Sequence, residues 1–429
     1  MNCTLVARRA TAWVVGAVLL LACPYALMGP SFHADDFSFL RNSHFDGPLH
    51  AAQGRQIGRP GAVVMYDLTF GLIGPHPLTI YVVQTALWVF AALAVLFALR
   101  QFLSPRRALA ITLVWLVVPT HTALEHWSST TQAFLALGLV AFGIGRLAVA
   151  CDGDKPPWLA FLALTAAVAS YEVIAGLAVT ALFGVPLLRQ GRLRWDVITR
   201  GGALLAVPLV WAMFHRVYVG PTGRLDFGLA VDSHLALGLE PFSGLGQLLG
   251  GAALAGAALA AIRLVRARPG AASVGFEHMS VAGLVIIVIG ILPLLSFSTN
   301  FYGMDDRLTV VSGVGAAMIW VGLVGMTASY LGRRVIQAAV LALIALVIPL
   351  RAANNRDWVD SGRAAKTETQ RLARLAQESR VVEVAGPLAT VGWITGLHNG
   401  WNATAATQLL LDRRDVVVDV IIDGKKTGP

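Results

Sequence analysis

Charged residues are scarce in this sequence. Only 13% of its 429 residues are Asp, Glu, Lys or Arg, about half of the roughly 25% found in an average soluble domain. Apolar residues make up 56%, and the mean hydropathy is +0.68. This composition excludes a soluble enzyme, a disordered chain and a coiled coil, and it leaves a polytopic membrane protein.

Cysteine and the common nucleotide and hydrolase motifs are also missing. Three cysteines in 429 residues exclude a disulfide scaffold. The sequence contains no Walker A motif, no GxSxG nucleophile elbow and no CxxC pair. ATP-driven transport and serine hydrolysis therefore lack support from the sequence.

Apolar runs of membrane length recur along residues 1–350. We expect about eleven transmembrane helices, at 11–29, 78–100, 108–122, 129–150, 158–170, 173–188, 202–219, 244–264, 280–298, 308–330 and 335–350. The apolar segment 61–74 is too short to span and predicts an interfacial or re-entrant piece. The sequence therefore predicts a transmembrane domain over 1–350.

The net charge of +9 is distributed unevenly between the two sides of these spans. Sixteen cations fall on one side, at Arg8, Arg9, Arg100, Arg106, Arg107, Arg146, Lys155, Arg189, Arg192, Arg194, Arg200, Arg263, Arg266, Arg268, Arg333 and Arg334. Since cytoplasmic loops are enriched in Lys and Arg, this side is predicted to be cytoplasmic. The N-terminus is then cytoplasmic and the C-terminus extracytoplasmic, in the plasma (inner) membrane of a bacterium. The net positive charge thus reflects the orientation of the chain in the membrane, and we expect no nucleic-acid partner.

Residues 351–429 differ in composition and contain no apolar run of membrane length. Residues 358–378 have helical character, and 380–385 and 415–422 alternate as strands do. We expect a small α/β appendage on the outer face, separate from the transmembrane domain.

The first outward loop, 30–60, carries the densest polar signal. Asp35 and Asp36 follow the first span directly, with His33 and Arg41 close by. Adjacent carboxylates at a membrane surface are costly, because like charges disfavour each other's ionisation. General-base catalysis is one purpose that such a pair would serve and metal binding is another, whereas a helix cap at Asp36 is the structural alternative.

Three later outward segments carry further polar residues. Glu125 and His126 lie at the mouth of the third and fourth spans, and Glu172 interrupts an apolar stretch. Intramembrane or interfacial carboxylates usually face a cavity or a partner, although a belt residue or a tight turn is the alternative. A zinc site is not supported, because no HExxH spacing occurs.

Arginine supplies the candidate phosphate ligands. Arg59 lies in the Gly58-Arg59-Pro60 step, and Arg307 follows Asp306 at the entry to a late span. A guanidinium grips phosphate with two parallel hydrogen bonds. Snorkelling of Arg59 and a local salt bridge between Asp306 and Arg307 are the structural alternatives.

The order of these features resembles the GT-C superfamily of integral-membrane glycosyltransferases, in particular its bacterial GtrII-like branch. The resemblance rests on Asp35-Asp36 after the first span, Gly58-Arg59-Pro60, His126 to Ser129, Tyr171-Glu172, and Asp306-Arg307 before Gly313. It covers residues 1–350 as architecture. The resemblance implies an all-α, GT-C-like polytopic fold and transfer of a sugar from a polyprenyl-phosphate carrier to a hydroxyl of a glycan or lipid acceptor.

The same resemblance implies roles for the residues. Asp35 or Asp36 would be the catalytic base, and the donor and acceptor would contact the substrate-binding candidates His33, Arg41, Arg59, Glu125, His126, Glu172, Asp306 and Arg307. No cofactor would be required, and a divalent cation would be compatible. Two other classes stay open, namely a lipid or solute transporter or flippase, and a non-catalytic scaffold of a cell-envelope assembly.

Overall fold

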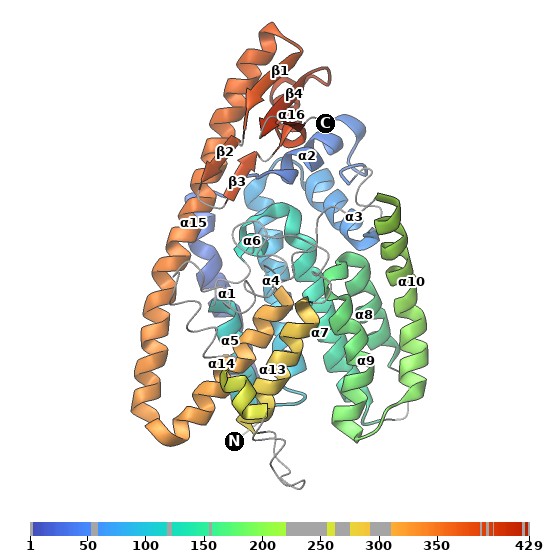
Figure 1. Cartoon of the computed structure of the whole chain (residues 1–429), viewed down its shortest axis with the longest axis vertical. Coiled ribbons are helices and arrows are strands. Elements are labelled where there is room, and N and C mark those ends of the chain that lie inside the picture. Colours follow the sequence, from blue (N-terminus) through green and yellow to red (C-terminus); the bar gives the residue numbers. More distant parts are fainter. Residues whose placement is uncertain are drawn as a thin grey trace.

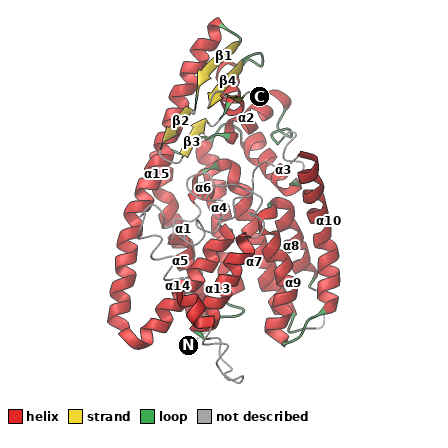
Figure 2. Cartoon of the chain, in the orientation of Figure 1, coloured by secondary structure: helices red, strands yellow, loops and turns green. Residues whose placement is uncertain are grey.

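The computed structural model describes residues 3–52, 59–117, 122–153, 157–219, 255–261, 275–291, 310–386, 388–391, 394–397, 399–422 and 425–427. The N-terminus lies at one end of an elongated helical molecule, and a small α/β unit near the C-terminus lies at the other (Figure 1). Helices dominate, and the few strands are confined to the α/β unit (Figure 2). The predicted fold class, a mainly helical membrane protein with a small α/β appendage, is therefore confirmed.

The first half of the chain builds the bundle. Its elements are α1 (Cys3–Met28), α2 (Asp35–Asp46), α3 (Pro60–Tyr66), the π-helical η1 (Asp67–Ile73), α4 (Pro77–Leu99), α5 (Pro105–Val117), α6 (Thr122–His126), η2 (Ser128–Thr130), α7 (Thr131–Ala150), α8 (Trp158–Ser170), η3 (Glu172–Ile174), α9 (Ala175–Gln190) and α10 (Trp195–Val219). Helix α7 packs on both α4 and α8. The bundle core contains large buried side chains such as Trp88, Trp115, Phe134 and Phe161.

The second half of the chain adds the helices α13 (Phe276–Ile291), α14 (Val310–Leu331) and α15 (Arg333–Glu378) to the bundle. Helix α15 has 46 residues and runs from the end of the molecule near the N-terminus to the α/β unit (Figure 1). The sequence predicted a span at 335–350 and a separate helix at 358–378. Instead the helix continues through 351–357, so the predicted domain boundary at 350 falls inside one element; the domain division itself stays a prediction.

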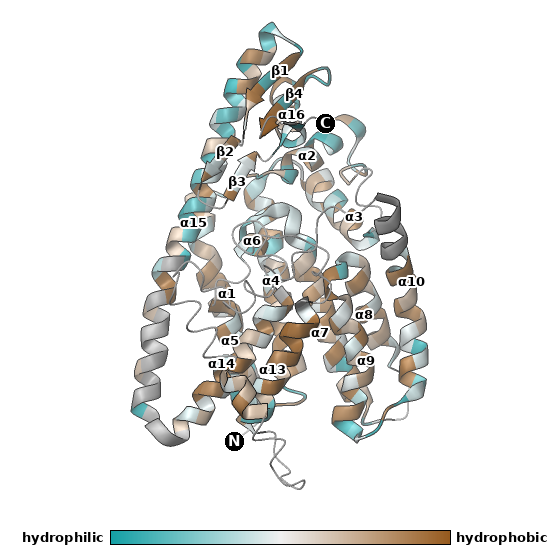
Figure 3. Cartoon of the chain, viewed as in Figure 1, coloured by the Kyte–Doolittle hydropathy of each residue, from teal (hydrophilic) through white to brown (hydrophobic). Residues whose placement is uncertain are grey.

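Five helical stretches in the described part of the chain are long and apolar enough to cross a membrane. They cover Arg8–Met28, Pro77–Leu99, Ser128–Ala150, Glu172–Gln190 and Val311–Ala328. Shorter apolar helices occur at Pro60–Ile73, Trp158–Ser170 and Phe276–Gly290. In Figure 3 most residues of the bundle are coloured as apolar, and hydrophilic residues are more frequent on the α/β unit and on the adjoining part of α15. The chain is a multi-pass membrane protein; the predicted number of eleven spans is not settled by these helices.

The α/β unit contains β1 (Val381–Ala385), β2 (Leu388–Val391), β3 (Ile394–Leu397), α16 (Gly400–Leu411), β4 (Val417–Ile422) and β5 (Lys425–Thr427). Strand β1 pairs in parallel with β4, and β5 pairs with β4 in antiparallel fashion, whereas β2 and β3 form a hairpin. The predicted strands at 380–385 and 415–422 are therefore confirmed as β1 and β4. Their inward residues pack with Leu372 of α15 and Ala403 of α16 in one small core.

Candidate functional site

The α/β unit fixes the start of α2, where the predicted acidic pair lies. Ala34, the residue before the helix, has a φ of +42°, a backbone region that residues with a side chain rarely adopt. Its N–H donates to the carbonyl of Gly396 in β3 at 2.7 Å. Such strain persists only where surrounding contacts enforce it. The C-terminal unit thus helps to set the direction in which Asp35 and Asp36 leave the backbone.

Asp36 is held by backbone donors on both carboxylate oxygens. The N–H of His33 donates to Oδ2 at 3.0 Å, and the N–H of Ser129 in η2 donates to Oδ1 at 2.8 Å. The side chain is fully buried. Burial raises the pKa of the Asp36 carboxyl well above its usual range, and the two N–H donors oppose this rise. Asp36 therefore joins the first outer loop to the α6–η2 turn and does not act as the predicted cap of α2.

Asp35 has different surroundings from its neighbour. It is half-buried at the first position of α2, and its Oδ1 accepts a hydrogen bond from Nδ2 of Asn402 in α16 at 3.2 Å. Asn402 is fully buried, and its own Oδ1 has no hydrogen-bond partner among the described residues. The amide oxygen of Asn402 thus lies next to the partly accessible carboxylate of Asp35. Of the two acidic residues, Asp35 is the one that a small molecule can approach.

A buried ion pair lies beside this loop. Arg351 of α15 donates from Nη2 to Oε1 of Glu125 in α6, and from Nη1 to the carbonyl of Leu116 at 2.9 Å. The two charged side chains are 8% and 3% exposed. Burial raises the pKa of the Glu125 carboxyl, and the Arg351 guanidinium opposes that rise. The pair fastens α15 to the turn that also carries Ser129.

His126 connects the same turn to α15. Its Nδ1 donates to the Thr122 carbonyl at 2.7 Å, and its Nε2 lies 2.8 Å from the side-chain amide of Asn355. The ring stacks on Trp358 with centroids 5.7 Å apart. Burial lowers the pKa of His126 to about 4, so the ring is neutral near pH 7. The two ring nitrogens face two oxygen atoms, the Thr122 carbonyl and Oδ1 of Asn355, which fix the orientation of the ring.

His33 also contacts Trp358. The two ring centroids are 4.9 Å apart in an edge-to-face arrangement. The indole of Trp127 donates to the His33 carbonyl at 3.1 Å. Burial, and to a smaller extent proximity to His126, lower the pKa of His33 to about 3. His33 is therefore a neutral, enclosed part of this cluster.

Arg59 and Glu172 form a second polar centre at the start of α3. Arg59 donates from Nε and Nη2 to the two carboxylate oxygens of Glu172, each at 2.5 Å. The guanidinium also lies 5.4 Å from the centre of the Tyr171 ring. Burial lowers the pKa of Arg59, but the charge and hydrogen bonds of Glu172 outweigh it and raise the pKa overall. The side chain is thus a permanent cation held in one orientation.

Arg41 joins α2 to α16, and its predicted substrate contact stays a prediction. Its Nε donates to Oε1 of Gln408 at 2.8 Å, and a guanidinium nitrogen lies 3.9 Å from Asp46. Around it, His44 contacts Asp412 at 2.8 Å. These contacts dock the α/β unit on α2 through polar groups.

The structure brings His33, Asp36, Glu125 and His126 into one buried cluster and places Asp35 at its edge. Arg59 and Glu172 form a separate pair. Asp306 and Arg307 lie outside the described residues, so their predicted convergence with Asp35 stays a prediction. Among the residues that the structure describes, no three His, Cys, Asp or Glu side chains gather as metal ligands would.

Sequence reasoning missed the contribution of α15. Arg351, Asn355 and Trp358 are spaced four and three residues apart, so they share one helix face. All three are buried against the acidic loop or the α6–η2 turn. The signal was a polar stripe directly after the apolar run 335–350, at a place where a break between domains was expected.

The buried His126 predicts a pH-dependent stability difference. Its folded-state pKa of about 4 is below the ordinary value near 6.5, so the unfolded chain binds more protons between these values and the His126 contribution is lost as pH falls. We expect the stability advantage of the wild type over His126→Gln to shrink by on the order of 2 kcal/mol from pH 7 to pH 5. Melting temperatures in detergent at pH 7, 6 and 5 measure this.

The exposed His76 provides the control for that measurement. His76→Gln should retain the pH dependence of the wild type. A gap between wild type and His126→Gln that stays constant or widens on acidification contradicts the neutral, buried His126.

No protein-family model matches this sequence, and no curated protein sequence matches it. Several solved structures are similar, among them the three that follow. Archaeoglobus fulgidus oligosaccharyltransferase with Zn and sulfate is 11% identical over 95% of this chain and 68% of that chain, with a TM-score of 0.43. ArnT from Cupriavidus metallidurans in the apo state is 13% identical over 97% and 87%, with a TM-score of 0.45. The apo oligosaccharyltransferase is 13% identical over 86% of this chain but only 58% of its own length, with a TM-score of 0.39.

These similar structures are an oligosaccharyltransferase and ArnT. At identities of 11–13% and TM-scores below 0.5, they assign neither a family nor residue roles to this chain. The roles of its residues must therefore follow from its own geometry.

Proposed function

We propose that this protein is a membrane glycosyltransferase that moves a sugar from a polyprenyl-phosphate carrier to a hydroxyl acceptor at the outer face of the membrane, with Asp35 as general base. One observation supports this most directly, namely the division between the two acidic residues. Asp36 has both carboxylate oxygens on backbone N–H donors. Asp35 is half-buried beside it, and only its Oδ1 has a hydrogen-bond partner among the described residues.

The proposed reaction uses Asp35 as proton acceptor. The acceptor hydroxyl transfers its proton to the free oxygen of the Asp35 carboxylate while its own oxygen forms a bond to the anomeric carbon of the donor sugar. The bond from that carbon to the phosphate oxygen breaks, and polyprenyl phosphate leaves with the electron pair. Attack opposite the leaving group inverts the anomeric centre. Asp36 holds the loop, so that Asp35 stays in one position through the step.

The leaving phosphate requires a cation, and we assign Arg59 to this role. Two of its nitrogens are bound to Glu172, which fixes the guanidinium and leaves the edge at Nη1 for a phosphate oxygen. Preorganised cations stabilise charge that develops in the transition state. Arg307 is the second candidate from the sequence, and it lies outside the described residues.

Other predicted substrate-binding residues receive positioning roles. Glu125 and His126 hold the turn that carries Ser129, and Arg41 holds α2 against α16. They act on Asp35 through the backbone and need not contact the donor. The reaction balances without a cofactor, and a divalent cation beside Asp35 remains compatible, which an assay with and without a chelator decides.

The proposed orientation places the site on the extracytoplasmic side. The N-terminus lies at the end of the molecule opposite the α/β unit and α2 (Figure 1). The cation-rich loops predicted to be cytoplasmic include the turn after α9, at that same end. The acceptor would then be a glycan or lipid of the outer leaflet or cell envelope, and the donor would enter from the outer leaflet.

A transfer assay tests this function. The purified protein in liposomes is supplied with a panel of radiolabelled polyprenyl-phosphate sugars and a cell-envelope lipid extract as acceptor. Release of polyprenyl phosphate together with labelled acceptor supports the proposal. Movement of an intact labelled donor across the bilayer without cleavage favours a flippase, and neither cleavage nor movement across the whole panel favours a scaffold.

Asn402 gives a smaller prediction at the same site. It donates to Asp35 Oδ1 at 3.2 Å, so Asn402→Ala frees the carboxylate to rotate. We expect transfer to fall about tenfold, as for the loss of one hydrogen bond to a charged group worth roughly 1.5 kcal/mol. Combining Asn402→Ala with Asp35→Asn should give no further loss, whereas additive losses would show that Asn402 acts independently of Asp35.

A further inference from the structure

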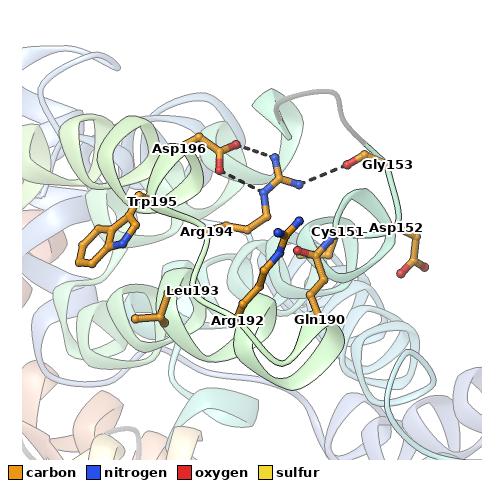
Figure 4. Close-up of a pocket in the computed structure, with 9 residues that line it drawn as sticks. All are labelled: Cys151, Asp152, Gly153, Gln190, Arg192, Leu193, Arg194, Trp195 and Asp196. Carbon is orange, nitrogen blue, oxygen red and sulfur yellow. Dashed lines mark hydrogen bonds and ion pairs between the residues drawn. The ribbon is translucent and has the colours of Figure 1, made fainter.

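A polar cavity of about 470 Å³ lies at the end of the bundle away from Asp35. Its walls are residues 151–153 after α7 and residues 190–196 between α9 and α10 (Figure 4). Helix α7 runs from the turn that binds Asp36 to this cavity, so the whole length of α7 separates the two places. The proposed transfer reaction uses none of the cavity residues.

The cavity lies at the depth where a membrane surface is expected. Two candidate spans, Ser128–Ala150 and Glu172–Gln190, end at its walls. Trp195 on its rim is 66% exposed, and Leu188 in the last turn of α9 is 75% exposed. Exposed tryptophan and leucine at the end of a span are typical of the boundary between acyl chains and head groups.

Hydrogen bonds between the two walls fix the shape of the cavity. Gln190 donates from Nε2 to the carbonyl of Cys151, and Arg194 donates from Nη1 to the carbonyl of Gly153 at 3.2 Å. Arg189, just outside, donates to Asp152 at 2.5 Å and to the carbonyl of Gln101 at 3.0 Å. A ligand would therefore enter a preformed site and would not have to order these loops.

Among the described residues in and beside the cavity, the three arginines Arg189, Arg192 and Arg194 outnumber the two aspartates Asp152 and Asp196. Arg194 is paired with Asp196 through two hydrogen bonds, and Arg189 is paired with Asp152. Arg192, in contrast, has no carboxylate partner among the described residues. Both Arg192 and Arg194 line the cavity (Figure 4). A cation without a carboxylate partner in a preformed polar cavity attracts an anionic group.

We propose that this cavity binds a phosphate group, either from the head group of an anionic phospholipid in the adjoining leaflet or from a soluble phosphate ester. A guanidinium binds phosphate oxygens with parallel hydrogen bonds, and basic pockets between transmembrane helices commonly bind anionic head groups. The position at the end of two spans and the exposed Trp195 and Leu188 favour the lipid. The proposal does not depend on the proposed sugar transfer.

Lipid binding to the purified full-length protein tests this site. Native mass spectrometry with phosphatidylglycerol, and with phosphatidylcholine as the head group without net charge, compares wild type with Arg192→Gln and Arg200→Gln. Arg200 is an exposed arginine on the first turns of α10 that does not line the cavity, so it is a matched control. We expect Arg192→Gln to weaken phosphatidylglycerol binding roughly fivefold, the effect of one cation near an anionic head group, and Arg200→Gln to leave it unchanged.

A second arm distinguishes the source of the phosphate. Binding of labelled glycerol 3-phosphate is measured with and without excess phosphatidylglycerol. Displacement by the lipid assigns the site to a lipid head group, whereas Arg192-dependent binding that the lipid does not displace assigns it to a soluble phosphate ester. The proposal is overturned if Arg192→Gln binds phosphatidylglycerol and glycerol 3-phosphate as tightly as Arg200→Gln does. It is also overturned if phosphatidylcholine binds the wild type as tightly as phosphatidylglycerol.

Discussion

Asp35→Asn is expected to lower sugar transfer to a small residual rate while the protein folds as the wild type does. Removing a general base costs on the order of 10²–10⁴ in rate, and an amide cannot take the proton of the acceptor hydroxyl. The half-buried Asp35 has one observed side-chain partner, Asn402, so the substitution removes little packing. Initial rates of transfer in liposomes, at saturating donor, measure the loss.

Asp36→Asn provides the contrast for that experiment. Both oxygens of Asp36 accept from backbone N–H groups, and the amide of asparagine would place its own N–H₂ against one of these donors. A buried unsatisfied donor costs about 1–3 kcal/mol, so this variant should lose stability, and its residual activity should follow the folded fraction. If Asp36→Asn folds normally and loses all transfer while Asp35→Asn retains it, the base has been assigned to the wrong residue.

Arg351→Met is expected to cause the largest loss of stability among single substitutions at the site, about 3–5 kcal/mol. It leaves the Glu125 carboxylate buried without its cation and removes the donor to the Leu116 carbonyl. The apparent melting temperature in detergent, measured by size-exclusion chromatography after heating, reports this loss. The double variant Glu125→Met with Arg351→Met should recover most of it, because no unpaired charge then remains inside.

An exposed ion pair on the same helix provides the control. Arg363 and Asp360 of α15 are 72% and 36% exposed, and exposed pairs contribute between zero and about 1 kcal/mol. Arg363→Met should therefore melt close to the wild type. If Arg351→Met is equally harmless, or if the double variant is worse than either single one, the buried pair does not fasten α15 to the α6–η2 turn.

Helix α15 explains why stability and the proposed chemistry are linked. The helix enters the outer unit without a break, and its polar face contacts the turn that holds Asp36. The same α/β unit supplies Asn402 to Asp35 and the Gly396 carbonyl to Ala34. The outer unit is therefore part of the candidate site, and removing it should expose Asp35 and release the strained backbone before α2.

Local patterns predicted much of the architecture because they depend on neighbouring residues. The apolar run 78–100 predicted α4, the alternation in 415–422 predicted β4, and the short apolar segment 61–74 corresponds to the apolar helical stretch Pro60–Ile73. The same reasoning placed a break between 350 and 358, where α15 is continuous. The composition changes at residue 350, but the helical propensity does not. Composition alone therefore does not mark the end of this helix.

The sequence by itself determined that this is a multi-pass membrane protein with a polar C-terminal appendage, and that an acidic pair follows the first apolar helix. Only the tertiary structure decided that Asp36 is enclosed by the backbone of His33 and Ser129, that Asp35 faces Asn402, and that Arg351 neutralises Glu125. Hydropathy and periodicity are properties of residues that are close in sequence, so they can be predicted without the fold. The surroundings of a carboxylate are set by groups as far as 367 positions away in sequence, and folding alone brings these together.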